Sequence, residues 1–233
     1  YERWKKTDMP DFDLTRELQL MDGKEEEIKE HFARALEFGT AGIRGTLGAG
    51  TNRMNIFVVR QTTEGLARYI LEEGLEKKVA ISYDSRLKGW TFAKEVSGVL
   101  AANGISVRLY DALMPVPALS FATRYYGCSA GIMLTASHNP AIYNGYKVYG
   151  SDGCQMTDEA ADKVYAKIKE TDVLTGAKRM SFSEAVQQGL IQFVEEGCKE
   201  AFYQAVLSQQ VHPGLCKEAG LSLVYTPLNG TGL

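Results

Sequence analysis

Apolar runs alternate with helical periodicity along the middle of the chain. Continuous apolar runs predict three strands, at residues 79–83, 106–110 and 131–134. Between them, apolar positions recur every three to four residues, which predicts helices from Thr91 to about Asn103 and from Pro117 to about Gly127. Strands that alternate with helices at short spacing predict an α/β domain with a largely parallel sheet.

The flanking segments carry the same kinds of pattern. Four-residue spacing of apolar side chains predicts a helix before the strands, and side chains that favour helix N-caps start two others. The predicted helices cover residues 24–36, 56–73, 157–170 and 195–211, and a further strand covers residues 221–226.

A turn signal adds a strand of opposite direction. Asn144-Gly145 is typical of a hairpin turn and precedes Tyr146-Lys147-Val148-Tyr149. The fold class expected is therefore a layered α/β domain whose sheet is mixed, mostly parallel and flanked by helices. Ligands of such sheets bind beyond the carboxyl ends of the strands, where Asp84-Ser85-Arg86 and Ser137-His138 fall.

Composition narrows the function classes. The chain has 233 residues and a formal net charge of −3, which argues against a nucleic-acid partner. It contains neither an apolar run long enough to span a membrane nor the apolar core of a signal peptide, so we expect a cytoplasmic protein without a membrane partner. Its four cysteines are widely spaced, which predicts reduced thiols and no zinc site, with Cys128 and Cys154 packed near the sheet.

Ser137 is the first candidate for chemistry. It follows a predicted buried strand in Thr135-Ala136-Ser137-His138-Asn139-Pro140. A serine in a turn commonly just bonds its own loop, whereas a catalytic serine needs a neighbouring base or carries the transferring group itself. The absence of a G-x-S-x-G pattern disfavours acyl hydrolysis.

Three basic side chains accompany this serine in the sequence. On an extended segment the side chains of Ser137 and His138 point apart, so His138 is predicted to steady an oxygen atom rather than to deprotonate the serine. Lys147, on the returning strand, is either a general acid/base or a solvated lysine. Arg44 lies among glycines that let backbone N–H groups approach an anion, but the segment is neither a P-loop nor a dinucleotide fingerprint.

Four segments in the same order resemble the α-D-phosphohexomutase family, which includes phosphoglucomutases and phosphomannomutases. Thr135 to Pro140 resembles that family's phosphoserine loop, and residues 38–45, Phe-Gly-Thr-Ala-Gly-Ile-Arg-Gly, resemble its arginine loop. Residues 144–147 are similar to the segment after the serine loop, and residues 225–230 to the opening of the second domain. The spacer at residues 141–143 and the N-terminal segment favour the branch of phosphoglucomutases and phosphopentomutases.

The resemblance implies a sugar-phosphate isomerase that works through a phosphoserine and a bisphosphate intermediate, with glucose 1,6-bisphosphate as activator. Ser137 would carry the phosphoryl group and bind Mg²⁺ through its phosphate. Lys147 would act as general acid/base, with His138 and Arg44 as its catalytic neighbours. The set expected to bind substrate or phosphate is Thr135, Asn139 and Arg86.

The chain departs from the family pattern in what it lacks. The D-x-D-x-D-R metal loop is absent, and Asp11-Phe12-Asp13-Leu14-Thr15-Arg16, which imitates it, is interpreted as an acid pair at the start of a helix. The expected organisation is an N-terminal helical extension at residues 1–36, domain I at 37–205 and a truncated second domain at 206–233. The missing partners are then domains II–IV of its own chain.

Such a fragment is expected to be inactive alone and to self-associate through an exposed strand at residues 221–226. Two alternatives for the parent protein remain: a phosphopentomutase, or a non-enzymatic module that binds phosphosugars.

Overall fold

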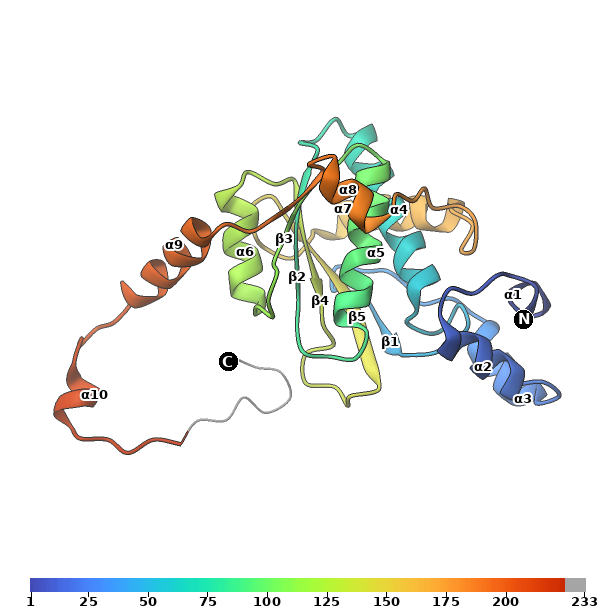
Figure 1. Cartoon of the computed structure of the whole chain (residues 1–233), viewed down its shortest axis with the longest axis horizontal. Coiled ribbons are helices and arrows are strands. Elements are labelled where there is room, and N and C mark those ends of the chain that lie inside the picture. Colours follow the sequence, from blue (N-terminus) through green and yellow to red (C-terminus); the bar gives the residue numbers. More distant parts are fainter. Residues whose placement is uncertain (225–233) are drawn as a thin grey trace.

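A six-stranded sheet forms the centre of the computed structural model, which describes residues 1–224 (Figure 1). The strand order is β1-β5-β4-β2-β3-β6. β2 is parallel to β3 and β4, and β3 is parallel to β6, whereas β5 is antiparallel to both β4 and β1. The strands are β1 Ile43–Thr46, β2 Lys78–Tyr83, β3 Ser106–Leu109, β4 Ala130–Leu134, β5 Tyr143–Gly150 and β6 Ile191–Phe193. The mixed, mostly parallel sheet predicted from the sequence is confirmed.

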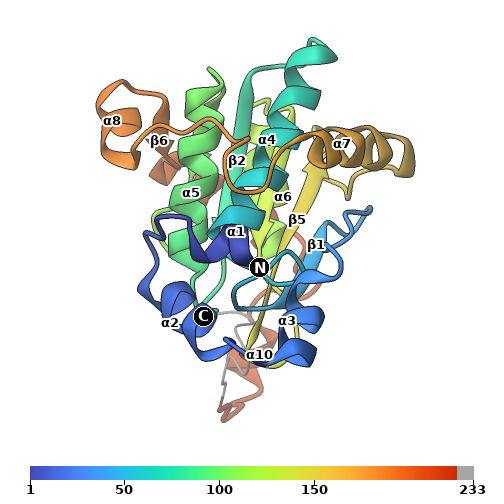
Figure 2. The same cartoon turned by 90° about the vertical axis from the view of Figure 1, so that its right-hand side faces the viewer.

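Helices cover both faces of this sheet. α4, α5, α7 and α8 lie on one side, and α6 and α9 lie on the other (Figures 1 and 2). The buried apolar side chains accordingly form two clusters, one on each face. The helices are α1 Glu2–Lys5, α2 Phe12–Leu20, α3 Glu25–Phe32, α4 Ile56–Glu72, α5 Gly89–Ala102, α6 Val116–Tyr125, α7 Asp158–Glu170, α8 Phe182–Gln187, α9 Glu196–Leu207 and α10 Leu215–Glu218. Among residues 1–224, no helix combines the length and the apolarity that crossing a membrane requires.

Local sequence explains where several elements begin. The side chain of Asn55 accepts hydrogen bonds from the backbone N–H groups of Phe57 and Val58, as an N-cap of α4 should. Thr157 caps α7 in the same way. β2 and β4 lie between helices on both faces, which explains their continuous apolar runs.

The hairpin turn predicted at Asn144-Gly145 is wrong. Both residues lie inside β5, and the chain reverses through residues 135–142 instead. The Asn144 side chain is buried and donates to the carbonyl of Leu87. A Cβ on Gly145 would lie 2.6 Å from the carbonyl oxygen of Thr135, so the glycine serves close packing rather than a turn. The antiparallel strand inferred from this signal is nonetheless present.

Other differences concern glycine-rich or peripheral segments. β1 lies in the glycine-rich stretch where no strand was predicted, and the helix expected to reach residue 211 ends at Leu207. Residues 221–224 form no strand, and residues 225–226 of that prediction, with the second-domain motif at 225–230, lie outside the described residues. Residues 221–224 therefore do not provide the exposed strand through which self-association was expected. Cys128 is buried as predicted, but Cys154 is exposed.

Candidate active site around the serine loop

Residues 135–142, here called the serine loop, connect β4 to β5 at the carboxyl end of β4. Ser137 is exposed and has a φ of +56°, a left-handed conformation that is rare for residues other than glycine. This conformation makes the chain turn at Ser137, and its Oγ lies 3.3 Å from Nδ1 of His138. The premise that the two side chains sit on an extended segment and point apart is therefore wrong.

A buried hydroxyl and a buried carboxylate shape the start of the loop. Thr135 Oγ1 accepts a hydrogen bond from the backbone N–H of Ser137 at 2.9 Å and donates one to Asp84 Oδ2 at 2.5 Å. Asp84 follows β2, and its other carboxylate oxygen accepts from the backbone N–H of Arg86. The ends of two parallel strands thus fix the backbone on which Ser137 sits.

Arg86 holds the rest of the loop through backbone carbonyls. Its Nη2 donates to the carbonyls of Ser137 at 2.7 Å and Asn139 at 2.6 Å. Its Nη1 donates to those of Pro140 and Tyr143, both at 3.0 Å. The side chain is only 6% exposed, and Nε lies 3.6 Å from the Asp84 carboxylate. All of these hydrogen bonds go to the protein itself, so binding of phosphate by Arg86 stays a prediction.

The arginine loop, residues 38–45, reaches the serine loop through one polar contact. Arg44, exposed on β1, donates from Nη1 to Asn139 Oδ1 at 3.0 Å. Arg44 stands opposite Gly145 of β5. Gly42 packs so tightly on this strand that a Cβ there would overlap the carbonyl of Tyr146, and its φ of +77° also favours glycine. Close backbone packing therefore brings together the arginine loop and the serine loop, which are about 95 residues apart in the sequence.

Lys147 approaches the same region from β5. It pairs with Met133 of β4, two residues before the serine loop begins. Because strand side chains alternate between faces, Lys147 points to the same face of the sheet as Gly145 and its partner Arg44. Lys147 is partly buried, and among residues 1–224 its ammonium group forms no ion pair. The lysine is thus on the returning strand as predicted, while its role stays a prediction.

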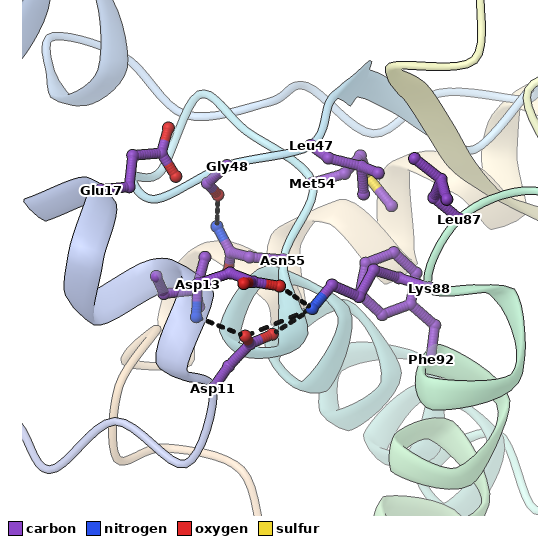
Figure 3. A pocket seen from close by; sticks show the side chains of 11 residues that line it. Asp11, Asp13, Glu17, Leu47, Gly48, Met54, Asn55, Leu87, Lys88 and Phe92 are labelled. Carbon is purple, nitrogen blue, oxygen red and sulfur yellow. Dashed lines mark hydrogen bonds and ion pairs between the residues drawn. The ribbon is translucent and has the colours of Figure 1, made fainter.

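A pocket of about 390 Å³ lies between α2 and the start of α5 (Figure 3). Lys88 stands at its edge with a φ of +64°, and its Nζ bridges Asp11 at 3.1 Å and Asp13 at 2.7 Å. Burial lowers the pKa of Lys88, but the hydrogen bonds to the two aspartates outweigh it and raise that pKa overall. Asp11 accepts from the N–H of Asp13 as the N-cap of α2, which confirms the interpretation of this acid pair as a helix start.

The described residues do not by themselves make a Mg²⁺ site. Residues 1–224 contain no group of three or more His, Cys, Asp or Glu side chains that could hold a metal ion. Asp84, the carboxylate that supports the start of the serine loop, already accepts hydrogen bonds from Thr135 and from the backbone of Arg86. Because Mg²⁺ prefers several oxygen ligands in octahedral geometry, Ser137 could supply at most one of them.

Three residues that position the candidate site by close packing could not be identified from the sequence. Gly42, Gly145 and Asn144 decide how closely the arginine loop, β5 and the serine loop approach one another. The signal available was the clustering of glycines in residues 39–50, which indicated a close backbone approach but not to which segment.

Comparison with known proteins gives one consistent result. Residues 35–174 match the family model of phosphoglucomutase/phosphomannomutase, alpha/beta/alpha domain I. A phosphoglucomutase of Staphylococcus saprophyticus is 36% identical over 209 residues, and one of Staphylococcus epidermidis is 38% identical over 208 residues. These alignments cover 90% and 89% of this chain but only 37% of each relative, so the chain spans little more than a third of their length.

A solved structure supports the same relationship. A provisionally named phosphomannomutase of Thermus thermophilus superposes with a TM-score of 0.64 and 29% identity, covering 82% of this chain and 39% of the other. A phosphoglucomutase/phosphomannomutase family protein of Burkholderia thailandensis, at 19% identity and a TM-score of 0.54, shares the fold. With its α/β sheet and serine loop, the chain belongs to the phosphoglucomutase/phosphomannomutase family and contains that family's domain I.

Proposed function

We propose that Ser137 is the phosphoryl carrier of a hexose phosphate mutase, which interconverts hexose 1-phosphate and 6-phosphate through a bisphosphate. The observation that carries this proposal is the serine loop itself. The only exposed hydroxyl at the carboxyl end of β4 within the described loop sits on a backbone fixed by Thr135 and Arg86. Phosphoryl transfer depends mainly on positioning and electrostatics, which such a rigid loop supplies.

The transfers balance without any further reactant. In the first, the P–O bond to Ser137 Oγ breaks, a P–O bond to the sugar hydroxyl forms, and the hydroxyl proton passes through a base to the released Oγ. Lys147 is the base we propose. His138 Nδ1, 3.3 Å from Oγ, is placed to hydrogen-bond the serine oxygen as it is released. After the bisphosphate reorients, its other phosphoryl group returns to Ser137 by the reverse steps.

Two residues from the predicted binding set act on the loop in this scheme. Asn139 directs the guanidinium of Arg44 toward the serine loop, where its charge would stabilise the transferring group. Thr135 supports Ser137 through its backbone N–H. The Mg²⁺ expected from the family resemblance would need ligands from outside residues 1–224, and glucose 1,6-bisphosphate is the expected activator.

The assay that tests this function follows conversion of glucose 1-phosphate to glucose 6-phosphate by the full-length protein, with Mg²⁺ and glucose 1,6-bisphosphate present. We expect turnover that Ser137→Ala abolishes and that Lys147→Met lowers in kcat more than in KM, because an acid/base acts in the transition state. Normal turnover by Ser137→Ala would overturn the mechanism. Absence of turnover with hexose phosphates, together with turnover of a pentose phosphate, would favour the phosphopentomutase.

A further inference from the structure

A second cavity, of about 390 Å³, lies on the side of the sheet that α4, α5, α7 and α8 cover. Its walls come from α4, α5 and the segment that leads into α8, which lie side by side on that face (Figure 2). None of its lining residues belongs to the serine loop, the arginine loop or β5. It is therefore separate from the site described above. We call it the basic cavity.

The basic cavity carries an excess of positive charge. Arg60, Lys94 and Arg179 line it, against a single carboxylate, Glu95. Within residues 1–224, neither Lys94 nor Arg179 forms an ion pair with a carboxylate. A wall with three cations and one anion favours an anionic ligand.

Arg60 supplies hydrogen-bond donors at the wall of the basic cavity. Its side chain is only 7% exposed, and its Nε donates to Glu95 at 2.7 Å. Among the described residues, its two Nη groups make no hydrogen bond to another residue, and neither is enclosed by the protein, so both remain accessible as donors to a ligand. An oxyanion in the cavity would satisfy these donors, since guanidinium groups bind phosphate in a bidentate geometry.

The cavity is also held open by backbone contacts. The N–H of Met180 donates to the carbonyl of Gly98 on α5 at 3.1 Å, and a Cβ on Gly98 would lie 2.5 Å from the Met180 carbonyl oxygen. Ser181 then caps α8 by accepting from the N–H of Glu184. A wall fixed in this way costs less to order on binding than a loose one.

We propose that the basic cavity is a second phosphate-binding site, which takes the dianionic phosphate group of a small phosphorylated metabolite. Its volume falls in the range of ligand pockets, about 300–1,000 Å³, and leaves room for a body beyond the phosphate. Phe182, which also lines the cavity, offers that body an apolar contact.

Calorimetric titration of the full-length protein tests the site. The Ser137→Ala background removes phosphoryl uptake at the serine loop, and the probes are orthophosphate and phenyl phosphate. Replacing both Lys94 and Arg179 with Gln is expected to weaken phenyl phosphate binding about tenfold or more, because two cations that attract the phosphate are removed. Both side chains are at least partly exposed, so the double variant should fold, which circular dichroism checks.

Lys178→Gln is the matched control. Lys178 is exposed, precedes Arg179 directly and does not line the cavity, so its loss changes the charge without changing the site. Its affinity for phenyl phosphate should stay within about twofold of the parent. An equal loss in Lys178→Gln and in the double variant, or no loss in the double variant, would overturn the site. Orthophosphate binding as tightly as phenyl phosphate would overturn the assignment to a phosphorylated metabolite.

Discussion

At the scale of single residues, the backbone of Ser137 explains its exposure. A left-handed serine costs about 1–2 kcal/mol relative to a right-handed one, and the surrounding hydrogen bonds offset that cost. Thr135 and Arg86 hold the residue from both sides through its N–H and its carbonyl. Strain retained at an exposed hydroxyl is consistent with a functional position.

This strain predicts a difference between two variants that both lack the hydroxyl. Ser137→Gly should have a free energy of unfolding about 1 kcal/mol higher than Ser137→Ala, because glycine adopts φ of +56° without a Cβ penalty. Urea unfolding measures both values. Equal stability of the two variants would show that the left-handed conformation carries no cost here.

Thr135 provides a second test at this scale. Thr135→Val keeps the shape but leaves the buried carboxylate of Asp84 without one of its donors, and should cost about 1–3 kcal/mol of stability. Because the N–H of Ser137 also loses its acceptor, we expect kcat to fall. Thr135→Ser retains the hydroxyl and serves as the control, so a variant series in which Ser and Val behave alike would refute the positioning role.

At the scale of elements, β1 and β5 bring the arginine loop to the serine loop, and this approach depends on glycine. Gly42→Ala should destabilise the protein by about 3 kcal/mol or more, because its Cβ would overlap the Tyr146 carbonyl and its φ is +77°. Gly39→Ala, in the same loop, meets nothing within 4 Å and should change stability by less than about 0.5 kcal/mol. Thermal unfolding of both variants decides whether close packing or loop flexibility requires the glycine.

The elements also show how far the sequence predicts the structure. Long apolar runs and capped helices, such as residues 79–83 and the helix after Asn55, are determined locally and were predicted nearly to the residue. Asn144-Gly145 misled because the same dipeptide suits a tight turn and a close strand contact, and only the tertiary neighbours distinguish them. β1 escaped prediction because its partner, β5, lies about a hundred residues further along the chain.

The sequence singled out the candidate site residues, whose roles stay predictions, but it did not indicate the contacts between their side chains. Arg44 hydrogen-bonds Asn139, which lies in the same loop as Ser137. Arg86 donates to four backbone carbonyls, three in the serine loop and one at the start of β5, and this arrangement depends on β2 and β4 lying side by side. No local pattern encodes that arrangement.

At the scale of the whole molecule, helices α1–α3 are part of the core rather than an appendage. Trp4 is 3% exposed and packs edge-on against Phe32 of α3 and Phe57 of α4. Trp4→Ala should therefore cost about 3–5 kcal/mol of stability, as truncation of a buried aromatic does. Phe12→Ala removes a side chain that is 76% exposed and should cost less than about 0.5 kcal/mol. A small loss for Trp4→Ala in urea unfolding would show that the N-terminal helices fold separately.

The described residues place one side of the candidate site, whereas the alignments cover only 37% of each relative. The metal ligands and the contacts that would select the sugar are therefore expected outside residues 1–224. The central proposal for this chain is that Ser137 accepts a phosphoryl group.

Mass spectrometry of the full-length protein tests that claim most directly. After incubation with glucose 1,6-bisphosphate and Mg²⁺, we predict a gain of one phosphoryl group in the intact mass, located on Ser137 by peptide mapping and absent from Ser137→Ala. A phosphoryl group on another residue, or none on a protein that turns over glucose 1-phosphate, would contradict the assignment of Ser137 as the carrier.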